Sequence, residues 1–250
     1  MFKTNFRRAG LLASLALLSA AGAQSLQPID PLQRPRTGAG SASFSVSAGY
    51  APDLRQTGQG VTSSVAGGLG LTASYNVTER FAVTASTGVG AARTQTLNGE
   101  AVRATSDLSW NGLSVGAQYT LEGRYAPALG LEVELPLTGN GWAVTGSGSA
   151  SLLRDPVILD GTLAATWRPG GAPSVSAGAG VGFVVNEAVT LRADAVQSLT
   201  FGDLTVPSTT LGLGGAYKLD EKNSVSARTT LGVSGGRTTT GLSVTYVYRP

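Results

Sequence analysis

The groups that could do chemistry in this 250-residue chain are carboxylates and guanidinium groups, because the sequence contains no His and no Cys. His is the usual general base at neutral pH and the commonest metal ligand, and Cys supplies thiolate nucleophiles, disulfides and zinc or iron–sulfur ligands. Their absence excludes Ser–His–Asp hydrolysis and cysteine catalysis. We therefore expect no enzyme, no metal site and no cofactor.

Six charged side chains occupy the polar positions of segments in which apolar and polar residues alternate. They are Glu132, Glu134, Asp160, Arg192, Asp194 and Arg228. If the segments are strands of a membrane barrel, these side chains point into the lumen, because a charge facing lipid is costly. They then form either an eyelet that sets charge selectivity or a network of ion pairs that braces the wall. The sequence leaves both interpretations open.

Glu132 and Glu134 also have the appearance of a glycosidase carboxylate pair. At positions i and i+2 of a strand they share one face. However, nothing in a water-filled lumen would raise the pKa of either carboxyl group, which the general acid of such an enzyme needs. We therefore assign no catalytic residue.

The elements that position these charges are twelve alternating segments between Ser41 and the C-terminus. They span residues 41–50, 60–75, 80–92, 106–121, 126–137, 142–153, 157–167, 174–185, 189–201, 209–219, 224–234 and 239–248. Period two indicates β-strands, and most segments have the length of a transmembrane strand. This predicts an all-β fold: an antiparallel up-and-down transmembrane β-barrel of about 12 strands over residues 41–250. The weakest alternation is in Trp142–Leu153, which is counted because an even number of strands is needed.

The connections between the segments alternate in length, as in outer-membrane barrels. Short periplasmic turns are expected at Asn76–Glu79, Glu122–Tyr125, Arg154–Pro156, Asn186–Ala188 and Asp220–Asn223. Longer outer loops are expected at Ala51–Gln59, Arg93–Thr105 and Gly202–Ser208. Three of the short turns share one pattern, in which an aromatic residue is followed four positions later by Glu. An aromatic girdle near this rim is expected from Tyr75, Phe81, Tyr119, Phe183 and Tyr217.

The N-terminal residues have the three parts of a secretory signal peptide. Lys3, Arg7 and Arg8 precede an apolar stretch, and Ala21-Gly22-Ala23 forms a cleavage site. We expect a signal peptide over residues 1–23, cleaved after Ala23, then a Pro-rich periplasmic arm over residues 24–40. Without those three cations, the remaining 15 basic residues balance the 15 acidic ones. The net charge of +3 therefore does not indicate a nucleic-acid partner.

Two motifs resemble a known family. Asn111–Tyr119, followed by Leu129–Gly139, is similar to the outer-membrane transporters associated with the meta-cleavage pathway of phenol degradation. Gly146–Ser149 resembles the entry to their next strand. Asn111 stands where that family typically has Asp, and Leu137 interrupts its Pro-Thr-Gly motif. The resemblance implies a 12-stranded barrel that passes small, hydrophobic molecules, and it identifies no particular substrate.

Three functions follow as hypotheses. The first is a passive channel or facilitator in the outer membrane for small solutes, hydrophobic ones included, with the lipid bilayer as its other partner. The second is a closed structural or interaction barrel of the cell envelope. The third is an exported soluble β-sandwich or adhesin. The sequence gives no indication of oligomeric state.

Overall fold

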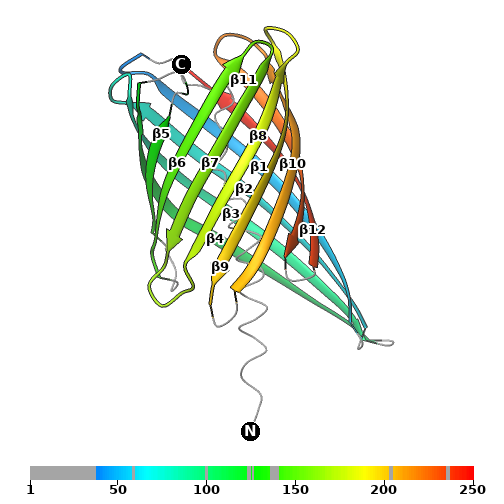
Figure 1. Cartoon of the computed structure of the whole chain (residues 1–250). Coiled ribbons are helices and arrows are strands. Elements are labelled where there is room, and N and C mark those ends of the chain that lie inside the picture. The colour runs from blue at the N-terminus through cyan, green and yellow to red at the C-terminus, as the bar shows by residue number, and fades with distance from the viewer. Residues whose placement is uncertain are drawn as a thin grey trace.

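Twelve antiparallel strands form one closed barrel (Figure 1). The computed structural model describes residues 38–57, 60–98, 101–122, 125, 127–135, 141–202, 205–234 and 237–250. The strands are β1 (Ala42–Thr57), β2 (Gly60–Asn76), β3 (Phe81–Asn98), β4 (Ala101–Thr120), β5 (Ala128–Leu135), β6 (Ala143–Arg154), β7 (Val157–Trp167), β8 (Ser174–Val184), β9 (Val189–Phe201), β10 (Thr205–Lys218), β11 (Asn223–Ser234) and β12 (Arg237–Tyr248). The predicted barrel is confirmed, and the predicted segment Trp142–Leu153 corresponds to β6, which is shifted by one residue.

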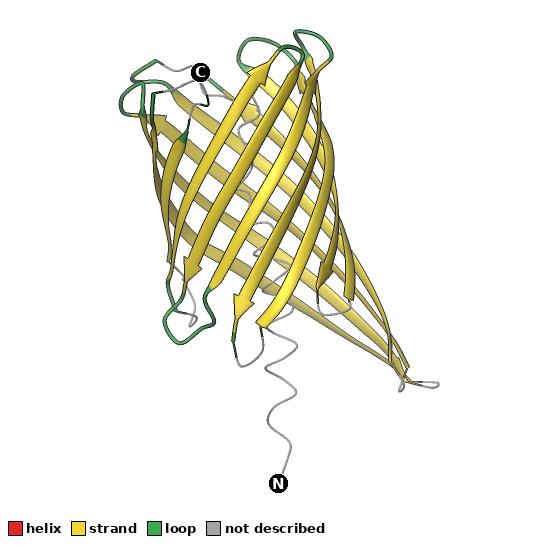
Figure 2. Ribbon diagram, viewed as in Figure 1, coloured by secondary structure: helices red, strands yellow, loops and turns green. Residues whose placement is uncertain are grey.

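Each strand pairs with its neighbours in sequence, and β1 pairs with β12 to close the sheet. Closure leaves no edge strand, so every strand finds a partner on both sides. The hypothesis of a soluble β-sandwich is therefore wrong. Strands and loops make up the described part of the chain (Figure 2), in which no helix is long and apolar enough to cross a membrane. The expected signal peptide and residues 24–37 of the expected arm lie outside the described residues.

The distribution of side chains is inverted relative to a water-soluble domain. Large apolar side chains such as Leu71, Leu163 and Leu213 are 54–64% exposed on the outer surface. They alternate along each strand with polar or small residues that face inward, as the period-two pattern predicts. A contiguous apolar belt of this extent is stable against lipid rather than water.

The short turns lie at one end of the barrel, where β1 begins and β12 ends; we call this end the terminal rim. Three of them share one hydrogen-bond pattern as well as one sequence pattern. Asn186 Oδ1 accepts hydrogen bonds from the backbone N–H groups of Ala188 and Val189 at 2.9 and 2.8 Å. The side chains of Thr78 and Asp220 accept the corresponding pairs. The residue before each Glu therefore closes the turn.

The opposite end, which we call the hairpin rim, differs from the prediction. Ala51–Gln59 and Arg93–Thr105 were expected to be loops, but β1 and β2 are separated by residues 58–59 and β3 and β4 by residues 99–100. The four strands continue together beyond the rest of the barrel (Figure 1). Gly202–Ser208 is likewise mostly strand, because β10 begins at Thr205. Pairing between these strands satisfies their backbone N–H and C=O groups, and Thr has a good β propensity. A polar sequence was therefore not sufficient to turn these segments into loops.

A β-bulge interrupts β4. Asn111 and Gly112 together lie opposite Gly88 of β3, and Gly112 has a φ of 78°, a conformation that favours glycine. Because of the extra residue, even-numbered positions face outward before the bulge and odd-numbered positions face outward after it. Leu108 and Trp110 therefore join Leu113 on the outer surface, which strict alternation along the segment did not predict.

Candidate functional site

Four of the six predicted lumen charges form one network on the inner wall. Asp160 lies on β7, Arg192 and Asp194 on β9, and Arg228 on β11. Arg192 Nη2 donates to both carboxylate oxygens of Asp160 at 2.5 Å. Arg228 donates to both oxygens of Asp194, with its Nε 3.2 Å from Asp194 Oδ1. Arg192 Nε lies 3.8 Å from Asp194 Oδ1, so the two pairs are continuous.

The network is electrically balanced and largely shielded. It contains two carboxylates and two guanidinium groups, so its formal charge is zero. The Asp160 and Asp194 side chains are only 5% and 4% exposed, whereas those of Arg192 and Arg228 are 18% and 29% exposed. Carboxylates this buried require their partners, because an unpaired charge at such a position is costly. The interpretation as a wall brace therefore fits these four residues.

Glycines on the intervening strands allow the ion pairs to lie flat against the wall. Gly180 of β8 is paired with both Asp160 and Asp194 in register, and a Cβ there would come within 2.6 Å of both Asp160 carboxylate oxygens. A Cβ on Gly212 of β10 would lie 2.5 Å from Arg228 Nη2 and 2.7 Å from Asp194 Oδ1. The side chains therefore cross β8 and β10 directly above the backbone instead of projecting into the lumen.

Glu132 and Glu134 lie apart from this network, on β5. Glu134 Oε2 accepts a hydrogen bond at 3.0 Å from Nη2 of Arg168, directly after β7. No described basic side chain forms an ion pair with Glu132. The single eyelet of six charges is therefore divided into a balanced network, a separate ion pair and the Glu132 carboxylate, which has no ion-pair partner among the described residues.

Arg168 was not among the lumen charges predicted from the sequence. Its position in the sequence could have indicated this role, because Arg168 falls on the same alternate positions as the inward-facing residues of the 157–167 segment. Residue Glu134, however, is 34 positions away in sequence, and only the barrel brings β5 and β7 to opposite sides of β6.

The inner faces of β12, β1, β2 and β3 form a second, uncharged wall. Away from the hairpin rim, their inward positions carry Ser, Thr, Gly and other uncharged residues, and Asp53, Arg55 and Arg237 occupy inward positions at the hairpin end of β1 and β12. Ser47 of β1, Gly70 of β2 and Thr245 of β12 are typical neighbours in this wall. The lumen therefore has a charged side and an uncharged side.

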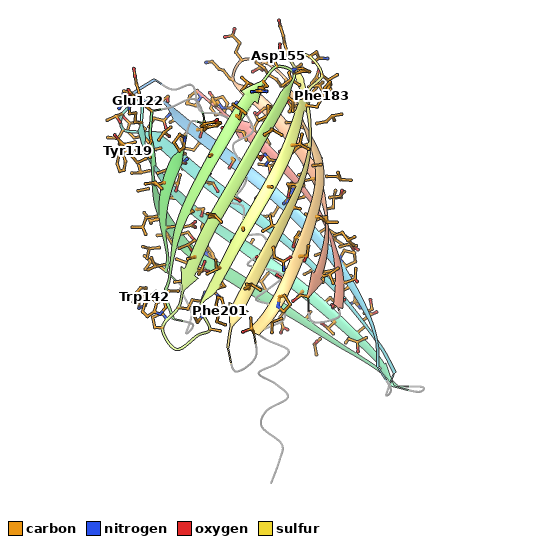
Figure 3. All side chains as sticks on the ribbon, in the orientation of Figure 1. Tyr119, Glu122, Trp142, Asp155, Phe183 and Phe201 are labelled. Atoms are coloured by element: carbon orange, nitrogen blue, oxygen red, sulfur yellow. The ribbon has the colours of Figure 1, made fainter. Side chains whose placement is uncertain are left out.

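The predicted aromatic girdle lies near the terminal rim. Tyr75, Tyr119, Phe183 and Tyr217 are 43–49% exposed, and Phe81 is paired with Tyr119. A second aromatic set, near the hairpin rim, was not anticipated. Its members are Tyr50, Trp110, Trp142, Trp167 and Phe201. Figure 3 shows Tyr119 and Phe183 towards one end of the barrel and Trp142 and Phe201 towards the other. Two aromatic bands bordering an apolar belt are typical of membrane barrels.

The arrangement offers no metal-binding cluster of three or more His, Cys, Asp or Glu side chains within the described ranges. Its chemistry is that of a polar wall with fixed, mostly paired charges. Such a wall can orient or repel a passing solute.

Comparison with known proteins identifies the fold. No protein-family model matches the sequence, and no curated protein is similar to it in sequence. The structure is similar to an outer-membrane channel from Pseudomonas putida, with a TM-score of 0.62 at 17% identity over 89% of this chain and 100% of the channel. It is also similar to the translocator domain of the autotransporter NalP from Neisseria meningitidis, with a TM-score of 0.60 at 13% identity over 95% of this chain and 98% of that one.

A third similar structure is the NanC porin, with a TM-score of 0.55 at 11% identity over 82% of this chain and 98% of the porin. These likenesses define the class: the chain has the fold of an outer-membrane β-barrel protein. The apolar belt agrees with that environment. The resemblance to phenol-pathway transporters stays a prediction.

Proposed function

We propose that this protein is a passive channel of the outer membrane for small solutes, hydrophobic ones included. The observation that carries the proposal is the placement of the lumen charges. Asp160, Arg192, Asp194 and Arg228 lie flat over Gly180 and Gly212 rather than across the barrel. A network that only filled the interior would have no need of glycines beneath it.

The rest of the inner wall supports the same function. Barrels of eight strands are filled by their own side chains, whereas those of 16 to 18 strands leave a water channel. Twelve strands fall between these two cases, so the size of the inward-facing side chains decides whether the lumen is open. Here they are largely Ser, Thr, Gly and Ala in the described strands, which leaves room for a narrow path.

The test is solute permeation through the refolded chain starting at Gln24, the residue after the proposed signal-peptide cleavage. Liposomes containing it should swell in neutral solutes up to a size limit, and phenol is the first hydrophobic solute to test. Ser47→Trp places a bulky side chain in the lumen and should slow permeation. Val46→Trp, at the adjacent lipid-facing position, is the matched control and should not. Equal rates for folded protein and empty liposomes would overturn the proposal.

A second candidate is an interaction barrel of the cell envelope, favoured by the extension of β1–β4 beyond the hairpin rim (Figure 1). Removing residues 55–60 and 97–102 separates the two functions. A channel keeps its permeation rates after this shortening, whereas an interaction barrel shows no permeation before it and loses its partner after it.

A further inference from the structure

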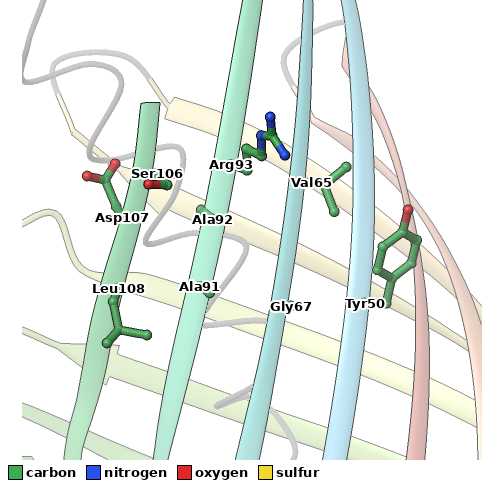
Figure 4. Close-up of a pocket in the computed structure, with 9 residues that line it drawn as sticks. All are labelled: Tyr50, Val65, Gly67, Ala91, Ala92, Arg93, Ser106, Asp107 and Leu108. Atoms are coloured by element: carbon green, nitrogen blue, oxygen red, sulfur yellow. The ribbon is translucent and has the colours of Figure 1, made fainter. Parts of the chain in front are cut away.

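The outer surface of the barrel has a shallow groove over β1–β4, near the hairpin rim. It is open to the surroundings and has a volume of about 440 Å³. Its main lining residues are Tyr50, Val65, Gly67, Ala91, Arg93 and Leu108 (Figure 4). We call it the Tyr50 groove. It lies outside the lumen, so it has no part in the proposed permeation.

The shape of the groove follows from strand register. Tyr50, Gly67, Ala91 and Leu108 are successive partners across the four strands. Gly67 and Ala91 are small and form a low floor, whereas Tyr50 and Leu108 stand on either side of it. Leu108 is 84% exposed, well above the 64% of Leu163 and Leu213 on the same belt. This leaves a trough with apolar walls that nothing in the described chain covers.

One cation lies at the outer end of the trough. Arg93 is two residues beyond Ala91 on β3, towards the hairpin rim, with Val65 and Ser106 as its register partners. Arg93 faces outward and forms no ion pair with a described residue. Asp107 also borders the groove, but it occupies the alternate position opposite Ala92. Figure 4 shows the Arg93 guanidinium on the side of β3 away from Asp107.

The aromatic band places this cation relative to the membrane. Trp110 lies two residues from Leu108 on the same outer face, towards the terminal rim, and its Nε1 donates to Thr87 Oγ1 at 3.0 Å. Aromatic bands mark the boundary between hydrocarbon and headgroups. The trough therefore lies at the edge of the hydrocarbon, and Arg93 lies beyond it, at headgroup level. Guanidinium groups bind phosphate through paired, charge-assisted hydrogen bonds.

We propose that the Tyr50 groove binds a phosphate-bearing lipid of the outer leaflet. One acyl chain lies over Gly67 and Ala91 between Tyr50 and Leu108, and the phosphate contacts Arg93. Apolar contact with the trough and charge pairing at its end favour an amphiphile of this shape over a neutral lipid. The proposal does not depend on conduction, so its failure leaves the channel untouched.

The test uses Trp110 as a reporter, because the chain has only three Trp residues. The Trp142→Phe/Trp167→Phe protein is reconstituted in phosphatidylcholine vesicles containing either phosphatidic acid or phosphatidylcholine with brominated acyl chains, which quench nearby indoles. We expect half-maximal quenching at an about fivefold lower mole fraction of the phosphatidic acid. Equal quenching by the two lipids would overturn the proposal.

Two variants with matched controls locate the effect. Arg93→Gln should abolish the preference, whereas Arg80→Gln, at the ion pair with Glu122 on the terminal rim, should keep it. Ala91→Ile fills the trough and should weaken quenching, whereas Ala85→Ile, on the same face of β3, should not. Folding of each variant is checked by its heat-modifiable migration. A preference that survives Arg93→Gln, or that millimolar inorganic phosphate abolishes, would refute the lipid site.

Discussion

The charged wall of β5, β7, β9 and β11 and the uncharged wall of β12, β1, β2 and β3 are built from the same alternating strands, yet they fill their inward positions differently. In the charged wall, long side chains bridge to the second strand along, and Gly180 and Gly212 on the strand between make room for them. In the uncharged wall, the nearest side-chain atom to a Cβ on Gly70 is the small hydroxyl of Ser47. In the Asp160–Arg228 network, each ion pair that crosses a strand therefore has a glycine beneath it on that strand.

This difference also divides the lumen electrically. Away from the hairpin rim, the fixed charges of these two walls lie on one side, and most of those in the described strands are paired, so a solute meets a polar, uncharged surface opposite a balanced network. The outer face shows no such division, because both halves carry the same apolar belt.

Breaking the network at its centre should be the most damaging change. Asp194→Ala removes the carboxylate that contacts both guanidinium groups and leaves Arg228 without its partner. We expect a loss of about 3 kcal/mol in the free energy of unfolding, measured by urea titration in neutral lipid vesicles. Ser47→Ala in the uncharged wall is the control and should cost much less. An unchanged unfolding midpoint for Asp194→Ala would show that the network does not brace the wall.

Adding a methyl group beneath the network should have the next largest effect. Gly212→Ala places a Cβ against Arg228 and Asp194, and we expect destabilisation of about 1–3 kcal/mol as the ion pair is displaced. Gly70→Ala meets Ser47 Oγ, which can rotate away, so its cost should be smaller. The same urea titration distinguishes the two, and equal costs would contradict the role given to the glycines.

The turns of the two halves should behave alike. Asn186→Ala, on the charged side, and Thr78→Ala, on the uncharged side, each remove a side-chain acceptor for two backbone N–H groups. Each should cost about 1 kcal/mol in the free energy of unfolding. Glu187→Ala is the control beside Asn186. A large difference between Asn186→Ala and Thr78→Ala would mean that the halves differ in more than their inner faces.

The smallest effect concerns Asp220 in the turn between β10 and β11. Hydrogen bonds from the Asn223 side chain, and then from the backbone N–H of Lys222, lower the pKa of this exposed carboxyl group. A lowered pKa stabilises the fold above the ordinary pKa of Asp, and the contribution disappears as the pH falls through the lowered value. Asn223→Ala should raise the Asp220 pKa towards its ordinary value in an NMR titration. An unchanged pKa would show that the amide does not stabilise the carboxylate.

The strands were predictable because lipid outside and polar residues inside impose period two on nearly every segment. The outward positions of Leu108 and Trp110 were not predicted, because the bulge at Gly112 changes the alternation. The neighbouring sequence contains no signal that would distinguish this bulge from a regular strand. The extension of β1–β4 was missed for a different reason. Beyond the membrane both faces of a hairpin meet water, so the apolar signal vanishes while the pairing continues.

For the site, parity identified which charges share the inner face but not which of them touch. The partners of Asp194 and Glu134 are 34 positions away in sequence, and register alone brings them together. The role of Gly180 and Gly212 was likewise hidden, because glycine is common on the inward face. The turn residues Thr78, Asn186 and Asp220 could have been predicted from the sequence, because each lies one position before the Glu of the repeated pattern.

Ion selectivity in planar bilayers tests the central claim most directly, namely that the network lies flat and balanced beside an open path. We predict stepwise conductance for the refolded chain. Arg192→Ala removes the cation that pairs with Asp160 and should shift selectivity towards cations, whereas Glu132→Gln removes a carboxylate that pairs with no described cation and should shift it towards anions. Folded, heat-modifiable protein that passes no current, or selectivity that neither variant changes, would contradict the account.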